Sequence, residues 1–199
     1  MVRCALSAAF FICLIAHANA SGGEVESDLK AWMIRQSDVQ RIEGRFLQHR
    51  QTPLLAKPLV SAGTFMLERP DRVRWVIENP EALVLEIEGD QIRAGRPGQL
   101  RTLPSVGAAA GLREMTDLFL GGSAAQIDQF RVVAGPVKDS FALTPRIAGA
   151  GSDLTRMVMV LGGPEGGLSE VMLETTAGDT SKIRFIDVVV RREVAENQP

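Results

Sequence analysis

Few side chains in this sequence could do covalent or acid–base chemistry. Of its two histidines and two cysteines, only His49 lies beyond residue 20. A serine nucleophile needs a neighbouring base, and no Gly-x-Ser-x-Gly elbow is present for His49 to serve. No His-Glu-x-x-His run or Cys/His cluster predicts a zinc site. We therefore expect no enzyme, no metal and no cofactor, and interpret His49 as a surface or hydrogen-bonded strand residue.

Two further features invite a chemical interpretation. Glu86 and Glu88 lie two residues apart on one predicted strand face, and paired carboxylates can act as acid and base. On a mixed strand face, however, such carboxylates are usually solvated charges. Residues 162–167 are rich in glycine, but they lack the Lys-Ser/Thr of a phosphate loop and no helix follows. We interpret this segment as a hairpin turn.

Arg69 is the charged residue whose position needs an explanation. Alternation along its strand places it on the same face as Phe65 and Leu67. A charge on an apolar face is costly unless it is paired or hydrogen-bonded. Either the side chain reaches solvent along its own stem, or its guanidinium is a latch bonded to backbone carbonyls of a covering element.

The stretch that positions Arg69, residues 62–92, predicts three consecutive antiparallel strands. Its three short apolar runs are separated by turn residues at 69–71, 79–81 and 89–90. With a period of two, one face is apolar and the other is mixed, with Val84 on the mixed face. The predicted apolar face consists of Phe65, Leu67, Val73, Trp75, Ile77, Leu83, Leu85 and Ile87.

The remaining segments predict a large sheet with a few helices, an α+β fold that is mainly β. Further strands are expected at 39–51, 99–103, 130–134, 140–146, 154–161, 168–174 and 182–191. The total is about ten strands, and a sheet of that size tends to curl or close.

Three helices are expected, at 24–36, 112–120 and 124–129. The first carries an apolar stripe of Val25, Leu29, Trp32 and Met33, and the second carries Leu112, Met115, Leu118 and Phe119. The mid-chain helices are flanked by glycines, so they could form either a movable cover or a fixed packed layer. Leu54 and Leu55, in a proline-bounded loop, either fold onto the core or form a contact surface for a partner.

The first 20 residues have the pattern of a cleaved signal peptide. Arg3 precedes an apolar run, and Ala18-Asn19-Ala20 is a small-x-small cleavage site. Residues 21–199 then form one expected domain, monomeric and without cysteine, which favours the periplasm. The net charge of −2 argues against nucleic acid and against general adhesion to an anionic membrane.

An ordered set of short motifs resembles a known family. The motifs are Phe46-x-Gln48, Gly63-x-Phe65, Glu68-Arg69-Pro70, Arg74-Trp75, Pro80, Gly89-Asp90 and the run Asp139-Ser-Phe-Ala-Leu-Thr-Pro145. In this order they resemble the periplasmic outer-membrane lipoprotein carrier family (LolA-like). The resemblance covers most of the chain beyond residue 20 and is densest over residues 46–92.

The resemblance implies an incompletely closed antiparallel half-barrel around a helical lid and an apolar cavity. Such a carrier takes acylated lipoproteins from an inner-membrane ABC transporter and passes them to an outer-membrane receptor. By the motif, Arg69 would close the lid through hydrogen bonds, Val73 stands where the family often has a cavity-lining Phe, and Trp75 matches the family's Trp.

The sequence also departs from the family pattern. Ile92 and Ala94 replace an aromatic pair, and residues 178–185 resemble a divergent branch found with glycolipid and polyene lipid genes. Lipoprotein is therefore the first expected cargo, with a glycolipid or polyene-type lipid as the alternative. A sensor or interaction domain built on the same fold is the alternative from a different class.

Overall fold

The computed structural model describes residues 22–103, 120, 124–147 and 153–193. Within these ranges eleven strands form one antiparallel sheet in the order β6-β5-β4-β3-β2-β1-β11-β10-β9-β8-β7. The strands are β1 Val39–Gln51, β2 Leu59–Glu68, β3 Arg72–Asn79, β4 Leu83–Glu88, β5 Gln91–Arg96, β6 Gln99–Leu103, β7 Phe130–Ala134, β8 Ser140–Pro145, β9 Leu154–Leu161, β10 Leu168–Thr175 and β11 Thr180–Arg192. The helices are α1 Gly22–Arg35, α3 Ala124–Ile127 and the short 3-10 turn η1 Pro164–Gly166.

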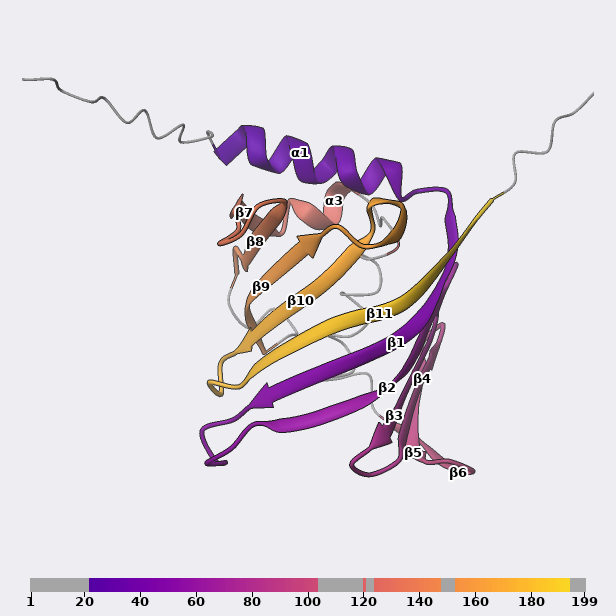
Figure 1. The fold of residues 1–199 in the computed structure, drawn as a ribbon. Coiled ribbons are helices and arrows are strands. Elements are labelled where there is room, and N and C mark those ends of the chain that lie inside the picture. Colours follow the sequence, from indigo (N-terminus) through magenta and orange to yellow (C-terminus); the bar gives the residue numbers. More distant parts are fainter. Residues whose placement is uncertain (1–21, 104–119, 121–123, 148–152, 194–199) are drawn as a thin grey trace, which may run out of the picture.

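The sheet curls without closing, which confirms the predicted half-barrel. Its end strands β6 and β7 are not neighbours in the described sheet. Figure 1 shows α1 lying across one end of the curled sheet, above β7 to β10, while the β1–β2 and β10–β11 turns lie at the far end. The predicted helix over 112–120, with Leu112, Met115, Leu118 and Phe119, lies outside the described residues except for Leu120.

One strand of the sheet was not predicted. The described sheet has eleven strands, close to the expected ten or so, and the additional one is β5 at residues 91–96. Ile92 is its only large apolar residue, so the local pattern is weak, and the strand exists because Ile92 pairs with Ile87 and Leu103. Val84 lies on the mixed face as predicted, in register with Val76, and it is buried there, with 3% of its surface exposed.

Cross-strand rows build the predicted apolar face on the inside of the curl. Each row crosses five strands in register, so the residues share one face. One row is Ile42, Leu67, Val73, Ile87 and Ile92, and the next is Gly44, Phe65, Trp75, Leu85 and Ala94.

Aromatic rings fill the centre of this inner face. The rings of Phe46 and Trp75 stack with centroids 4.0 Å apart, and Phe65 lies 6.0 Å from Trp75 and 5.0 Å from Phe185. Phe65 fits because its cross-strand neighbour is Gly44, where an added Cβ would lie 3.1 Å from the Phe65 ring. Tilted and offset rings at these separations add to the stabilisation from buried area.

Helix α1 covers one end of the core with the predicted stripe. Val25, Leu29, Trp32 and Met33 are all buried and belong to the same apolar cluster as the inner face of the sheet. The helix begins two residues earlier than predicted and contacts β7 and α3.

A bulge in β11 changes which residues face inward. Asp187 has a positive φ of 52°, and the pairing with β1 shifts register beside it. Ile183 and Phe185 join the core before the bulge, and Val188 and Val190 join it afterwards. A single alternating pattern through 182–191 therefore assigns half of this strand to the wrong face.

We expect Gly63→Ala to destabilise the protein by about 2 kcal/mol or more, because overpacking a tight site forces the backbone to shift. A Cβ built at Gly63 would lie 1.8 Å from the carbonyl oxygen of Val76. Gly23→Ala is the matched control, since its Cβ would meet nothing within 4 Å and α1 would gain up to about 1 kcal/mol of helix propensity. Urea unfolding of both variants measures the difference. Equal midpoints would show that the β2–β3 contact can relax.

Candidate functional site

An apolar pocket lies on the inner face between β1, β2, β11 and the β9–β10 turn. It is lined by Ile42, Phe65, Leu67, Phe185, Val188, Val190, Leu168, Pro164, Gly167 and the amide-bearing Gln36. The cavity measures about 30 Å³. A space of that size holds only a few water molecules, which is far less than an acyl chain occupies.

The predicted cargo-binding residues occupy different depths around this pocket. Phe65 and Leu67 line it directly. Val73 and Trp75 are buried in the core on the neighbouring strand, and Ile77 and Leu85 pack against that core while half-exposed. Leu83, at the beginning of β4, is 42% exposed and contributes little apolar cover.

Three of the ten described lining residues come from a strand whose inward-facing side chains the sequence pattern did not identify. Phe185, Val188 and Val190 belong to β11 and lie beside β1 only because the last strand pairs with the first. The β-branched composition of residues 182–191 was a visible signal for a buried strand. The bulge at Asp187 concealed which of its residues face inward.

Arg69 lies at the end of β2 with its guanidinium on two backbone carbonyls. Its Nε donates to the carbonyl oxygen of Val39 at 2.7 Å, and its Nη2 donates to the carbonyl oxygen of Leu120. The backbone N–H of Arg69 also donates to the carbonyl oxygen of Gln40 at 2.9 Å. The half-buried charge is thus solvated by backbone dipoles. Arg69 joins β2 to the start of β1 and to the residue that ends the predicted helix at 112–120.

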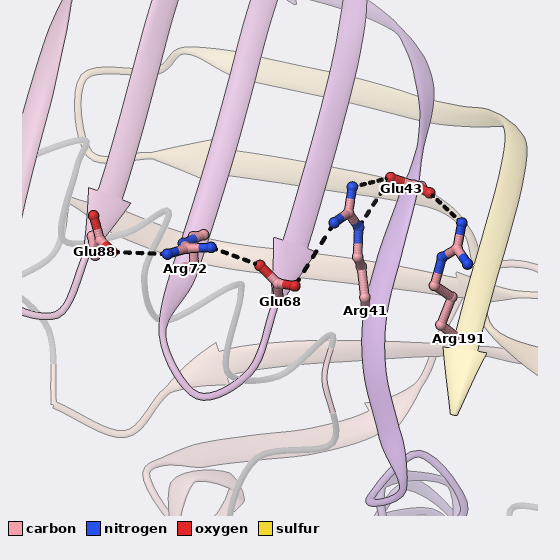
Figure 2. A network of polar contacts seen from close by, with 6 residues as sticks. All are labelled: Arg41, Glu43, Glu68, Arg72, Glu88 and Arg191. Carbon is pink, nitrogen blue, oxygen red and sulfur yellow. Dashed lines mark hydrogen bonds and ion pairs between the residues drawn. The ribbon is translucent and has the colours of Figure 1, made fainter. Parts of the chain in front are cut away.

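A row of alternating charges crosses the opposite face of the sheet beside Arg69 (Figure 2). Arg72 lies between carboxylates on two neighbouring strands, 3.0 Å from Glu88 and 3.1 Å from Glu68. Arg41 lies between Glu43 of its own strand and Glu68 of β2, and Arg191 pairs with Glu43. The row runs Arg191, Glu43, Arg41, Glu68, Arg72 and Glu88 from β11 to β4. These ion pairs link β1, β2, β3 and β4 near the end of β2, where Arg69 lies.

The row changes how its carboxylates titrate. The hydrogen bonds from Arg41, together with its charge, hold the pKa of Glu43 below its usual range. Arg72 does the same for the pKa of Glu88. Both carboxylates are solvent-accessible, so water and salt weaken these pairs. The row is therefore an arrangement for positioning strands rather than a buried acid–base pair.

The other chemical candidates are not brought together into a reactive site. Glu86 pairs with Arg74 at 3.6 Å and with Arg93 at 3.0 Å, and His49 is exposed on β1. In the described ranges no cluster of three His, Cys, Asp or Glu side chains could hold a metal ion. No helix in the described part of the chain is both long and apolar enough to cross a membrane.

The apolar concave sheet and its rim arginine agree with a sequence-level match. The family described as outer membrane lipoprotein carrier protein LolA matches residues 37–198. The chain belongs to this family. The matched range begins just before β1 and includes every strand of the half-barrel. The family is named for carrying lipoproteins, not for a catalysed reaction.

Several solved structures are similar to this LolA-family chain at low sequence identity. A LolA superfamily protein from Nitrosomonas europaea is 8% identical, with 83% of this chain and 94% of that chain covered and a TM-score of 0.44. A lipoprotein-sorting protein domain from Vibrio parahaemolyticus is 10% identical, with 88% and 96% covered and a TM-score of 0.45. A chain of the Pseudomonas aeruginosa MucA/MucB complex is 17% identical, with 85% and 59% covered and a TM-score of 0.38. No curated protein matches the sequence.

The charge row of this LolA-family chain predicts a pH-dependent stability. Arg41 lowers the folded pKa of Glu43, so the carboxylate stabilises the fold above its unfolded pKa of about 4.3, and this contribution is lost as the pH falls through the lowered folded pKa. We expect the urea midpoint of Glu43→Gln to lie below that of wild type near neutral pH and to converge with it in acid.

Glu78→Gln is the matched control for this experiment, because Glu78 is exposed on β3 and has no ion pair among the described residues. Its midpoint should follow wild type at every pH. A gap for Glu43→Gln that persists at the acid end would show that the effect comes from packing and not from charge.

Proposed function

We propose that this chain is a non-enzymatic carrier that shields the acyl chains of lipoproteins against the concave apolar face of its half-barrel. The observation that carries the proposal is that the apolar face ends, at the rim of the half-barrel, at the Arg69 guanidinium. Phe65 and Leu67 lead directly to Arg69 along β2, and Arg69 is bonded to the carbonyl oxygens of Val39 and Leu120. Apolar surface and a separable polar contact are what reversible lipid storage requires.

The small volume of the pocket is the reason that the proposal includes a movable cover. About 30 Å³ holds no acyl chain, so cargo must displace whatever covers the inner face. Each CH₂ removed from water contributes about 0.8 kcal/mol. A hydrogen bond from a charged donor is worth about 1.5–3 kcal/mol. A few methylenes therefore offset the loss of the Arg69 contacts, and we assign the helix predicted at 112–120 as the lid.

The sequence and the family support a proposal about the setting of this carrier. We propose that residues 1–20 direct export and are removed, and that residues 21–199 act as a monomeric domain in the periplasm. An inner-membrane ABC transporter would supply the cargo and an outer-membrane receptor would accept it. A glycolipid or polyene-type lipid would suit the same apolar face and is the alternative cargo.

Replacing Arg69 tests the latch and the carrier function together. We expect Arg69→Leu to fold and still bind an acylated probe, but to hand it over differently, because the closed form loses its two side-chain contacts. Arg69→Lys should be intermediate, since lysine keeps the charge without the planar fork. The measurement is transfer of a fluorescently labelled lipopeptide from the protein to acceptor vesicles, beside a melting curve.

Arg45→Leu is the control, because Arg45 is exposed on the outer face and pairs only weakly with Asp187 at 3.4 Å. Transfer by Arg69→Leu at the wild-type rate and with wild-type stability would show that Arg69 is an ordinary strand-end charge. If mass spectrometry of the wild type finds no bound lipid and no added acyl chain binds, the carrier proposal itself fails.

A second candidate function rests on the β1–β2 turn. Leu54 is 92% exposed, and Leu55, Leu59 and Val60 are also exposed around it. Figure 1 shows this turn far from α1, at the opposite end of the sheet. Several exposed apolar side chains together indicate a contact surface. On this reading the fold is a sensor or interaction domain that docks a protein partner through the turn.

A double substitution Leu54→Asp and Leu55→Asp separates the two functions. We expect it to abolish partner capture in a pull-down if the turn docks a protein, while acyl binding persists, because the turn is remote from the pocket. Ile34→Asp is the control, since Ile34 is 70% exposed on α1. Equal capture by the double variant and wild type would exclude the turn as the docking surface.

A further inference from the structure

A polar groove lies directly beside the apolar pocket. It has a volume of about 570 Å³, and its lining includes Arg35, Asp38, Glu165 and Arg192. Gln36 lines both the groove and the apolar pocket, and its side chain is only 4% exposed. The two spaces therefore adjoin at Gln36, one small and apolar, the other larger and lined by charged side chains.

The β9–β10 turn is the partition between these two spaces. Pro164 and Gly167 line the apolar pocket, whereas Glu165 and Gly166 line the groove. Two contacts hold the turn in place. The indole N–H of Trp32 donates to the carbonyl oxygen of Gly166 at 2.8 Å, and Arg192 pairs with Glu165 at 2.7 Å. Moving this turn would join the pocket to the groove.

One face of β11 forms a floor that runs through both spaces. Val188, Val190 and Arg192 are spaced by two residues, so their side chains lie on the same face. Val188 and Val190 line the pocket, and Arg192 lines the groove. A molecule lying along this row would contact apolar surface at Val188 and Val190 and a guanidinium at Arg192. An acyl chain with a polar group at its end has the same order of apolar and polar parts.

The chemistry around Arg192 defines what kind of polar group fits. Its Nε donates to Glu165, and its Nη1 donates to Asp38 and to the carbonyl oxygen of Arg35. Among the described residues Nη2 has no partner, so it can donate to an oxygen of a ligand. Two carboxylates next to the guanidinium disfavour a second anion at this place. A neutral carbonyl suits the site better than a free carboxylate.

We propose that the groove is the head-group part of the lipid site, where Nη2 of Arg192 donates to the ester or amide carbonyl that ends an acyl chain. The chain lies along Val190 and Val188 in the pocket, which enlarges as the β9–β10 turn moves aside. This inference rests on the proposed carrier function and adds a selectivity to it. Acyl esters and amides bind in preference to free fatty acid anions.

The test compares binding of monomyristoylglycerol and myristate to the full chain by titration calorimetry. We expect wild type to prefer monomyristoylglycerol. Arg192→Gln should weaken its binding about ten-fold, the size of one lost hydrogen bond from a charged donor. Arg191→Gln is the matched control, because Arg191 lies on the outer face and pairs with Glu43. It should stay within about two-fold of wild type, as expected for loss of an exposed ion pair.

Glu165→Gln keeps the test decisive if Arg192→Gln is poorly folded. Removing that carboxylate loosens the β9–β10 turn for both lipids but removes repulsion only from the anion, so the ratio of myristate affinity to monomyristoylglycerol affinity should rise about three-fold or more. Equal effects of Arg192→Gln and Arg191→Gln in folded proteins, or no rise in that ratio for Glu165→Gln, would overturn the head-group site. Failure of wild type to bind either lipid would instead overturn the carrier function on which it rests.

Discussion

An open sheet with one apolar face must be covered, and this requirement governs the whole molecule. The inner rows of the eleven-stranded sheet place isoleucine, leucine, valine and aromatic side chains side by side from β5 to β11. Exposing them to water costs about 25 cal/mol for each Å² of apolar surface. Curling brings the two halves of the sheet toward each other, and α1 covers one end. The centre is then filled by stacked rings, with Gly44 leaving room for Phe65.

Two arginines lie where apolar rows along the strands of the inner face end. Arg69 ends the row on β2 and is bonded to the backbone carbonyls of Val39 and Leu120. Arg192 ends the row on β11 and is bonded to carboxylates and to the carbonyl of Arg35. Both are arginines, whose planar forks satisfy several acceptors at once. The interior is therefore bounded at two places by contacts that are polar, directional and separable.

These boundaries suit a protein that binds by burial and releases by rearrangement. An acyl chain is held by the loss of its contact with water and needs no specific bond along its length. Specificity and timing must then come from the ends of the site. The LolA family match supports this division of roles, because a carrier has to hold its cargo in transit without making release too costly. The outer charge row links the strand ends near Arg69.

The sequence by itself determined the local order of this protein. Alternation in residues 62–92 identified three strands and their inner face, because a period of two is set by the strand backbone. The stripe of Val25, Leu29, Trp32 and Met33 identified α1 in the same way, and the ordered motifs identified the family. Arg69 was also visible, as a charge in phase with Phe65 and Leu67.

Only the tertiary structure decided what meets across the sheet. The pairing of β1 with β11 brings Phe185, Val188 and Val190 to the apolar pocket, and no local pattern records which distant strands become neighbours. The bulge at Asp187 reverses the alternation of β11, so the inward positions of Val188, Val190 and Arg192 depend on register. β5 forms because Ile92 pairs with Ile87 and Leu103 on the neighbouring strands, not because its own residues favour a strand. Contacts between distant segments are set by packing of the whole chain, and they are therefore absent from any short window of sequence.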